Sequence, residues 1–294
     1  MAAAGSSGSG GSIDLGLRGS TVVVTGAGSG IGAAAARLLG AAGASVVLVG
    51  RREALLRQCA DAIERAGGRA FCVAADLADP ASPAWIISAA HKAFGRVDGL
   101  VNNAAVCRHF PLPGWDMAGF DEHMTTNVRA PYFLIQAALP FLRESQVRSV
   151  VNISSSSGTL RLSGQSVYGM TKAALDYLTQ SLAGELAPER IRVNAIAPGP
   201  IDTPIHATWA DDLDEVYRWL AGQVPLGRIG DADEVARWIA LLLSPASSFM
   251  TGAVIPLDGG QVIPRALRRI TGQGSAGLEP RKPGAGWPAA SARS

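Results

Sequence analysis

The chain has 294 residues, of which 48% are hydrophobic and 17% are charged, and its formal net charge is +2. This composition supplies a substantial core. It excludes a largely disordered chain and a protein that coats nucleic acid through a strongly basic surface. We therefore expect a globular protein with no nucleic-acid partner.

The two ends of the chain differ in composition from the part between them. Residues 2–12 are only Ala, Gly and Ser, which predicts a flexible leader over residues 1–12. Residues 264–294 carry six basic residues, one acid, several Pro and Gly, and few apolar side chains, which predicts a disordered basic tail. Residues 13–263 remain as a single domain, because no break in composition interrupts them.

The cysteines and the apolar stretches bear on the compartment. Cys59, Cys72 and Cys107 show no metal-ligand spacing, so we expect reduced thiols and no bound metal. The longest apolar stretch, 33–50, is interrupted by Arg37 and by glycines, whereas a membrane span needs ~20 uninterrupted apolar residues. The amino terminus lacks the apolar segment of a secretory signal. We expect a cytoplasmic protein with no membrane partner.

From residue 17 to about residue 260, short β-branched runs alternate with helical patterns. Such alternation is typical of right-handed βαβ units and of a parallel sheet that helices cover on both faces. It predicts an α/β fold with a doubly wound, Rossmann-type, parallel seven-stranded sheet. The expected strands are 21–25, 45–49, 70–74, 99–102, 149–153, 192–195 and 254–256. The expected helices are 32–42, 53–66, 81–94, about 118–142, 166–186 and 232–243.

The segment 202–222 departs from this alternation. It has a helical pattern, contains Trp209, Tyr217 and Trp219, and follows the sixth expected strand. Ligands of doubly wound sheets bind beyond the carboxyl ends of the strands. The pattern therefore fits a cover over a substrate, and it fits a plain surface helix equally well.

The first expected strand runs into a glycine-rich turn and a helix. Three consecutive valines at 22–24 suit a strand that is buried on both faces. The turn reads Gly26-x-x-x-Gly30-x-Gly32, which differs from the commoner G-x-G-x-x-G. Strand, turn and helix in this order direct backbone N–H groups at a phosphate, and glycine lets the phosphate approach. An ordinary tight turn gives the same pattern.

Tyr168 and Lys172 lie on one face of the helix expected over 166–186, because positions i and i+4 share a face. A nearby cation lowers the pKa of a phenol, which brings tyrosine toward acid–base catalysis near neutral pH. The strand expected over 149–153 runs into four serines, and Ser155 precedes Tyr168 by 13 residues. A hydroxyl there is placed to hydrogen-bond a substrate oxygen, although the four serines leave the assignment open by one position. An incidental pair on an amphipathic helix and a polar strand cap are the alternatives.

These motifs together resemble the short-chain dehydrogenase/reductase family in its single-domain form. The resemblance covers roughly residues 17–261. It rests on TGAGSGIG at 25–32, Asp76, NNAA at 102–105, Asn127, the set of Ser155, Tyr168 and Lys172, PGPIDT at 198–203, and TGAVIPLDGG at 251–260. It implies NAD(P)-dependent hydride transfer between a nicotinamide nucleotide and a ketone or secondary alcohol, which is the small-molecule substrate.

The resemblance also implies roles for residues of this chain. Tyr168 would be the general acid and base, Lys172 would lower its pKa and hold the nicotinamide ribose, and Ser155 would orient the substrate oxygen. Asn127 would hold a water in a proton relay to Lys172, which completes the catalytic set. The implied cofactor-binding residues are Gly26, Ser29, Gly30, Ile31, Gly32, Arg51, Arg52, Asp76, Leu77, Asn103, Ala104, Tyr168, Lys172, Ile201 and Thr203.

Several of these cofactor contacts are specific. Asp76 would accept a hydrogen bond from the adenine amino group, Asn103 would close the floor of the site, and Ile201 and Thr203 would meet the nicotinamide carboxamide. The chain departs from the family at Ala105, where Asn-Ala-Gly is usual. The extra methyl bears on how closely the backbone approaches the cofactor, and we read it as tolerated.

The end of the second expected strand bears on the choice of coenzyme. NAD-specific relatives usually carry an acid there, and this chain has Gly50 followed by Arg51 and Arg52. No carboxylate repels a 2′-phosphate, and two guanidinium groups are available to bind one. Ser29 counts against this, because many NADP-using relatives have a basic residue at that place. We favour NADP(H), with NAD(H) as the alternative.

The leading interpretation is an NADP(H)-preferring ketone reductase or alcohol dehydrogenase, and the family includes 3-oxoacyl reductases. One alternative is an NAD-dependent sugar or cyclic polyol dehydrogenase. Another is a non-catalytic nucleotide-binding sensor, against which the complete catalytic set argues. The candidates for substrate contact are His109, Phe110, Arg161, Leu162, His206 and Trp209.

The segment 133–141 is strongly apolar for a helix expected next to the surface. Members of the family pair this helix across a two-fold axis, and obligate interfaces are large and apolar. We therefore expect a homotetramer or a homodimer.

Overall fold

The computed structural model describes residues 15–209 and 212–263. The described residues up to Val262 form one compact unit. The leader expected over 1–12 and the tail expected over 264–294 lie outside the described residues.

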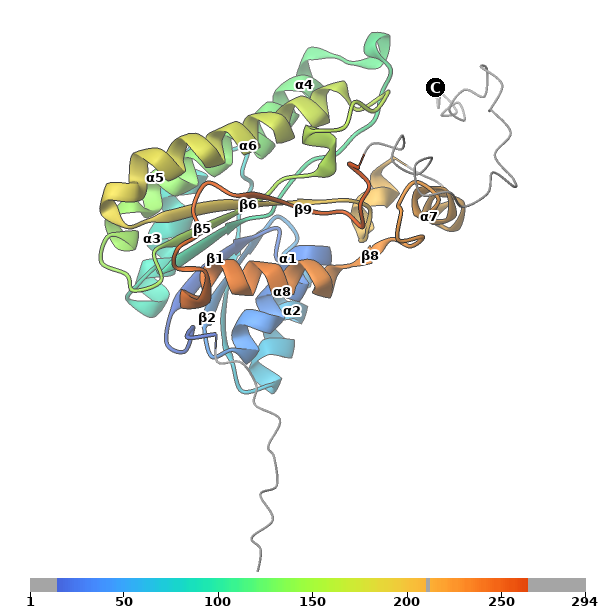
Figure 1. The fold of residues 1–294 in the computed structure, drawn as a ribbon. Helices are drawn as coiled ribbons and strands as arrows, with labels where there is room; N and C mark the ends of the chain where they lie inside the picture. Colours follow the sequence, from blue (N-terminus) through green and yellow to red (C-terminus); the bar gives the residue numbers. More distant parts are fainter. Residues whose placement is uncertain (1–14, 210–211, 264–294) are drawn as a thin grey trace, which may run out of the picture. The chain divides into compact units, whose positions relative to one another are not determined.

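A parallel sheet of seven strands forms the centre of the unit, as predicted (Figure 1). The strand order is β3-β2-β1-β4-β5-β6-β9, in which every neighbouring pair is parallel. Every residue of β1 is buried, because helices cover both faces of the sheet, and its consecutive valines suit this position. The strands are β1 Thr21–Thr25, β2 Ser45–Gly50, β3 Arg69–Ala74, β4 Gly99–Asn102, β5 Ser149–Ile153, β6 Arg192–Pro198 and β9 Val254–Leu257.

Helices cover both faces of this sheet (Figure 1). One face carries α1 Gly30–Ala41, α2 Glu53–Arg65 and α8 Ala232–Leu243. The other face carries α3 Ser82–Phe94, α5 Ala130–Leu142 and α6 Ser166–Leu186. Shorter elements follow the strands: α4 Met117–Met124, α7 Leu213–Ala221, and the 3₁₀ turns η1 Leu112–Gly114, η3 Ser156–Gly158, η4 Ala187–Glu189, η5 Pro204–Thr208 and η6 Pro245–Ser247.

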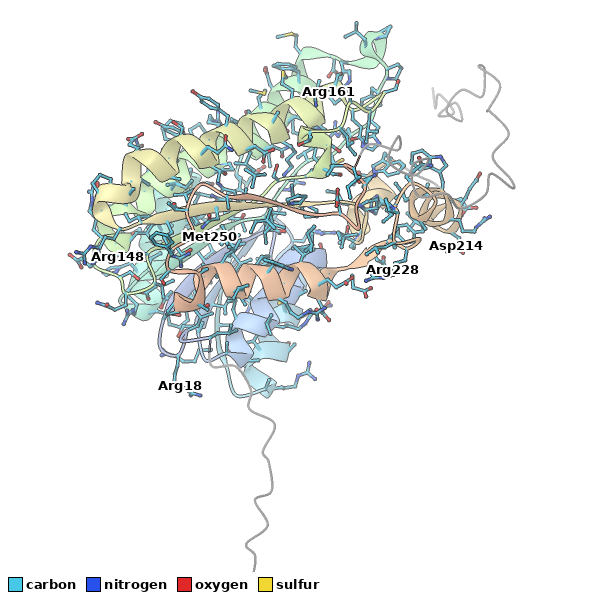
Figure 2. All side chains as sticks on the ribbon, in the orientation of Figure 1. Arg18, Arg148, Arg161, Asp214, Arg228 and Met250 are labelled. Carbon is cyan, nitrogen blue, oxygen red and sulfur yellow. The ribbon has the colours of Figure 1, made fainter. Side chains whose placement is uncertain are left out.

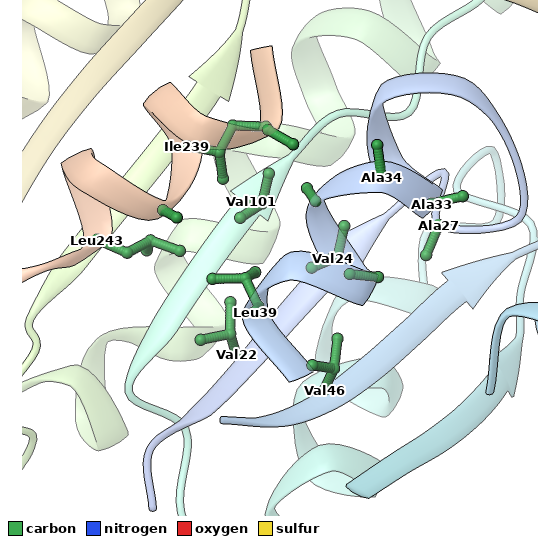
Figure 3. Close-up of a cluster of buried hydrophobic side chains, with 14 of the residues drawn as sticks. Val22, Val24, Ala27, Ala33, Ala34, Leu39, Val46, Val101, Ile239 and Leu243 are labelled. Atoms are coloured by element: carbon green, nitrogen blue, oxygen red, sulfur yellow. The ribbon is translucent and has the colours of Figure 1, made fainter. Parts of the chain in front are cut away.

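The core on the first face packs α1 and α8 side by side against β1 (Figure 3). Val22 and Val24 point from the strand toward Leu39 of α1 and toward Ile239 and Leu243 of α8, and all five are fully buried. A fully buried side chain of this size contributes ~1.5–3 kcal/mol by leaving water. This packing fixes the direction in which α1 leaves the turn that follows β1.

The structure differs from the sequence prediction where one helix was expected over about 118–142. A π-helical turn, Thr125–Arg129, separates α4 from α5. Pro131 has no N–H, so it cannot make the bond to the carbonyl of Asn127 that a continuous α-helix requires. Turns of this kind inside helices are frequent at functional sites.

A second difference lies beyond β6. Two short strands, β7 Ile201–Asp202 and β8 Gly230–Asp231, form a separate parallel pair. Each has only two residues, which is too short for a periodic pattern to reveal. The pair anchors the start and the end of the segment that contains η5 and α7.

Candidate active site

The carboxyl ends of three neighbouring strands meet at one edge of the sheet. β1 ends at Thr25, β4 at Asn102 and β5 at Ile153, and these strands are adjacent in the order β1-β4-β5. Because the strands are parallel, the glycine-rich turn, Asn103 and the serine cluster all follow the same edge. Ligands of doubly wound sheets bind at this edge.

The three motif glycines of the turn have no room for a side chain. Gly26 has φ +67°, and a Cβ built on it would lie 2.7 Å from Nδ2 of Asn103. A Cβ on Gly32 would collide with the carbonyl oxygen of Gly26. Gly30 has φ +50°, and its Cβ would lie 3.0 Å from Cγ2 of Thr203. The predicted residues at 26, 30, 32, 103 and 203 are therefore brought together by close packing.

Thr25 and Asn103 hold the two strand ends together. Oγ1 of Thr25 accepts hydrogen bonds from the backbone N–H groups of Asn103 (2.9 Å) and Ala104 (3.1 Å), and it donates to the carbonyl of Val101 (3.2 Å). Nδ2 of Asn103 donates to the carbonyl of Thr25 at 2.8 Å. The floor of the site and the glycine-rich turn are thus one hydrogen-bonded piece.

The start of α1 fits the phosphate of a nucleotide cofactor. No side chain caps the helix, and its first turn contains no acidic residue. Ser29 precedes the helix, and its Oγ accepts a hydrogen bond from Nη2 of Arg52 at 3.3 Å. The partial positive charge of a helix amino terminus and a guanidinium group both favour a bound anion. Arg51 is exposed beside Arg52, in the loop that follows β2.

The other predicted cofactor residues lie along the same edge. Asp76 is exposed after β3, where its Oδ1 accepts a hydrogen bond from the backbone of Ala78 at 2.9 Å, and the next residue, Leu77, is buried. Ile31 is in the first turn of α1. Ile201 is buried in β7. The structure therefore places these residues at the edge of the sheet where the carboxyl ends of the strands lie.

Tyr168 and Lys172 are buried on the face of α6 that is turned toward the end of β5. The phenol of Tyr168 is hydrogen-bonded to the hydroxyl of Ser155, the residue immediately before η3. Nζ of Lys172 lies 5.6 Å from the centre of the Tyr168 ring and donates to the carbonyl of Ile153 at 2.8 Å. The three residues predicted from the sequence are therefore neighbours.

Asn127 is buried in the π-helical turn. Its Oδ1 accepts from the backbone of Val106 at 2.9 Å, and its Nδ2 donates to the carbonyl of Val106 at 2.9 Å and to Oγ1 of Thr171 at 3.1 Å. The side chain thus ties the loop after β4 to α6, one residue before Lys172. The expectation that Asn127 holds a water in a proton relay to Lys172 stays a prediction.

Burial is the largest influence on the pKa values of Tyr168 and Lys172. It raises the pKa of Tyr168, the neighbouring Cys107 thiol acts in the same direction, and the hydrogen bond from Ser155 opposes both. Burial also lowers the pKa of Lys172 to about 8. Removal from water has the largest effect on the phenol in this structure, and the expected lowering of its pKa by Lys172 stays a prediction.

The segment after β6 contacts the loop after β4. Oγ1 of Thr208 donates to the carbonyl of Cys107 at 2.8 Å, and the His109 ring stacks on Trp209 with centroids 4.5 Å apart. His206 packs edge-on against Trp209 at 5.5 Å. Burial lowers the pKa of His109 to about 4, so this ring is neutral at physiological pH.

Three of the expected substrate contacts are thus brought together, namely His109, His206 and Trp209. Phe110, Arg161 and Leu162 are exposed. Figure 2 shows Arg161, and Asp214 on α7, at the end of the unit where the strands terminate, with Arg148 at the opposite end.

Known proteins resemble this chain over most of its length. Residues 26–261 match a family model described as enoyl-(acyl carrier protein) reductase. A tropinone reductase homolog of Arabidopsis thaliana is 35% identical over 248 residues, covering 84% of this chain and 80% of that protein. An L-rhamnose 1-dehydrogenase (NAD(P)(+)) of Azotobacter vinelandii is 39% identical over 247 residues, covering 82% and 95%. The crystal structure of a short-chain type dehydrogenase/reductase from Mycobacterium marinum matches with a TM-score of 0.80 at 31% identity, covering 85% and 98%.

This chain belongs to the short-chain dehydrogenase/reductase family. The predicted family and the predicted sheet are confirmed. As a short-chain dehydrogenase/reductase, the protein is an NAD(P)-dependent oxidoreductase of alcohols and ketones. No helix within residues 15–209 and 212–263 is long and apolar enough to cross a membrane.

Sequence reasoning missed three residues of this dehydrogenase/reductase site. Thr25 lies within the glycine-rich motif, but its hydroxyl was given no role. Thr171 and Cys107 belong to no motif, and they were revealed only by their contacts with Asn127 and His109. A threonine that ends a buried strand just before a glycine-rich turn was a usable signal for the first of them.

We predict that Thr25→Val destabilises the protein by ~2–4 kcal/mol. The substitution keeps the shape but leaves the backbone N–H groups of the half-buried Asn103 and Ala104 without an acceptor, at ~1–2 kcal/mol each, the lower part of the usual cost. Urea unfolding measures the effect, and Thr25→Ser, which keeps the hydroxyl, is the matched control. Equal stability of the Val and Ser variants would show that these bonds contribute nothing.

Proposed function

We propose that the protein is an NADP(H)-preferring oxidoreductase of ketones and secondary alcohols in which Tyr168 transfers the proton. The burial of Tyr168 and Lys172 next to the half-buried Ser155, at the edge of the sheet that the glycine-rich turn also follows, is the observation that carries the proposal. The bound nicotinamide coenzyme supplies the hydride in reduction and accepts it in oxidation.

The residues of the chain handle the proton. In reduction, Tyr168 donates its phenolic proton to the carbonyl oxygen, and Ser155 hydrogen-bonds the same oxygen from beside the phenol. Lys172 stabilises the resulting phenolate through its charge, which acts more strongly in a buried site than in water. Asn127 holds the loop after β4 against α6, and so keeps this face of the site in position.

Tyr168→Phe should lower kcat at least ~10²-fold, because it removes the proton donor and keeps the ring. The affinity for NADPH should stay near that of the wild type, since the glycine-rich turn and Arg52 are untouched. Tyr177→Phe, on the exposed side of the same helix, is the control. Steady-state kinetics and fluorescence titration of NADPH measure the two effects. Near-normal turnover by Tyr168→Phe would favour the nucleotide-sensor alternative.

The preference for NADP(H) is supported by the loop after β2. Gly50 offers no carboxylate to repel a 2′-phosphate, and Arg51 and Arg52 are both exposed there. Arg52 already reaches the glycine-rich turn through Ser29. A guanidinium group binds phosphate through two parallel hydrogen bonds, which a ribose hydroxyl does not reproduce.

Arg52→Ala should therefore raise KM for NADPH at least ~10-fold, a loss of ~1.4 kcal/mol, and leave KM for NADH nearly unchanged. Arg57→Ala is the control, because Arg57 lies on α2 and pairs with Glu53. Initial rates with both coenzymes give the result. Equal use of NADH and NADPH by the wild type would contradict the preference.

The substrate class has two candidates. One is a ketone of the kind that a reductase consumes, including a 3-oxoacyl thioester. The other is a sugar or cyclic polyol, which the similarity to an L-rhamnose 1-dehydrogenase favours. Rates with NADPH and a panel of ketones, and with NADP⁺ and a panel of aldoses, distinguish the two. The free thiols of Cys59, Cys72 and Cys107 support a reducing, cytoplasmic compartment.

We also propose that the protein is a homodimer or homotetramer assembled through α5. Tyr132 and Phe133 are each 43% exposed on this helix. Light scattering should show a dimer or tetramer. The double variant Tyr132→Glu, Phe133→Glu should shift it toward the monomer, because paired charges oppose an apolar interface. Trp85→Glu, at an exposed position of α3, is the control. A stable, active wild-type monomer would contradict the assembly.

A further inference from the structure

Asp176 lies on α6 one helical turn beyond Lys172, where no proposed catalytic step uses it. Its Oδ1 is buried and has no hydrogen-bond partner among the described residues. A carboxylate oxygen buried without a partner is costly unless a nearby cation balances its charge. The ammonium of Lys172 is the cation that acts on this carboxyl.

The same carboxyl packs against the turn that carries Ser155. A Cβ built on Gly158 would lie 2.8 Å from Oδ2 of Asp176 and 3.2 Å from the backbone carbon of Lys172. The end of η3 is therefore seated directly on α6 at these two residues. The hydroxyl of Ser154 has one proton to donate, and two acceptors compete for it: the carbonyl of Lys172 at 3.3 Å and the carboxyl of Asp176.

The charge on Lys172 depends on few neighbours. Burial lowers its pKa to about 8, while Cys107 and Asp176 oppose this effect. Burial raises the pKa of the Cys107 thiol to about 12, so the thiol is neutral at physiological pH. The ring of Tyr168 faces the same ammonium. Burial also raises the pKa of Asp176, and Ser154 and Lys172 oppose that rise.

We propose that Asp176 is a positioning residue, whose carboxylate keeps Lys172 charged and seats the serine turn that presents Ser155 to Tyr168. The proposal rests on the proposed function, in which the Lys172 ammonium stabilises the phenolate, and on the contact with the coenzyme ribose that the family resemblance implies for Lys172. The Asp176 side chain would thereby affect both the protonation of Lys172 and the position of Ser155.

The test follows the dissociation constant of NADPH by fluorescence between pH 6 and pH 10, with kcat measured alongside. In the wild type, binding weakens as Lys172 loses its proton. Asp176→Asn removes the negative charge and keeps the shape, so the midpoint of that weakening should move ~0.5–1 unit to lower pH, less than the ~1–3 units of a direct contact. Asp176→Glu should restore the wild-type midpoint. Glu185→Gln, which removes an exposed acid from the same helix, should leave the midpoint in place.

A midpoint that stays at the wild-type value in a folded Asp176→Asn protein would overturn the inference. If that variant does not fold, Ser154→Ala decides. It keeps the carboxylate but loosens the turn, so kcat should fall several-fold at an unchanged midpoint, and wild-type kcat would overturn the proposal.

Lys172→Met distinguishes a failure of the role proposed for Lys172 from a failure of the role proposed for Asp176. If the alkaline weakening persists in that variant, the proposed role of Lys172 fails. If it disappears while Asp176→Asn has no effect, only the role of Asp176 fails.

Discussion

The hydrogen bonds of the Thr25 hydroxyl connect the ends of two parallel strands, and the geometry of the coenzyme site depends on them. This one oxygen accepts from two backbone N–H groups after β4 and donates to the carbonyl of Val101, so its bonding capacity is used completely. Asn103 then donates to the carbonyl of Thr25 and fills the space beside Gly26 and Gly32. A side chain at either glycine would push the floor away from the turn, which explains why the motif requires glycine there.

The sequence predicted the seven strands because each is a short β-branched run flanked by turns, and three of them match to the residue. Helices α6 and α8 also match to the residue, because in each of them apolar residues recur at helical spacing from the first turn to the last. The expected helical segment over about 118–142 is present as α4, the π-helical turn and α5, but periodicity over 25 residues does not reveal the π-helical turn within it. The reason is visible afterwards in Pro131, which cannot bond the carbonyl four residues earlier. The pair β7–β8 was missed because its pairing partners are distant in the sequence.

The candidate site divides in the same way. Residues that belong to motifs, such as Tyr168, Lys172 and Ser155, could be predicted, because their chemistry requires fixed residue types at fixed spacings. Their protonation could not, because it depends on how much water the fold removes. A pattern of Tyr and Lys predicts a lowered phenol pKa, whereas full burial raises it. Thr171 has no chemical signature at all, and only its hydrogen bond to Asn127 reveals its place.

Burial favours the neutral form of both Tyr168 and Lys172, so the site disfavours a phenolate and an ammonium alike. A proton relay nevertheless needs an ammonium close to the phenol, and a group outside the pair has to favour it. The Cys107 thiol is neutral across the physiological range and supplies no such charge. Asp176 carries a carboxylate one turn along the same helix, with one oxygen buried and unpaired. In our proposal the negative charge of Asp176 keeps Lys172 protonated, and the ammonium of Lys172 in turn offsets the cost of burying that carboxylate oxygen.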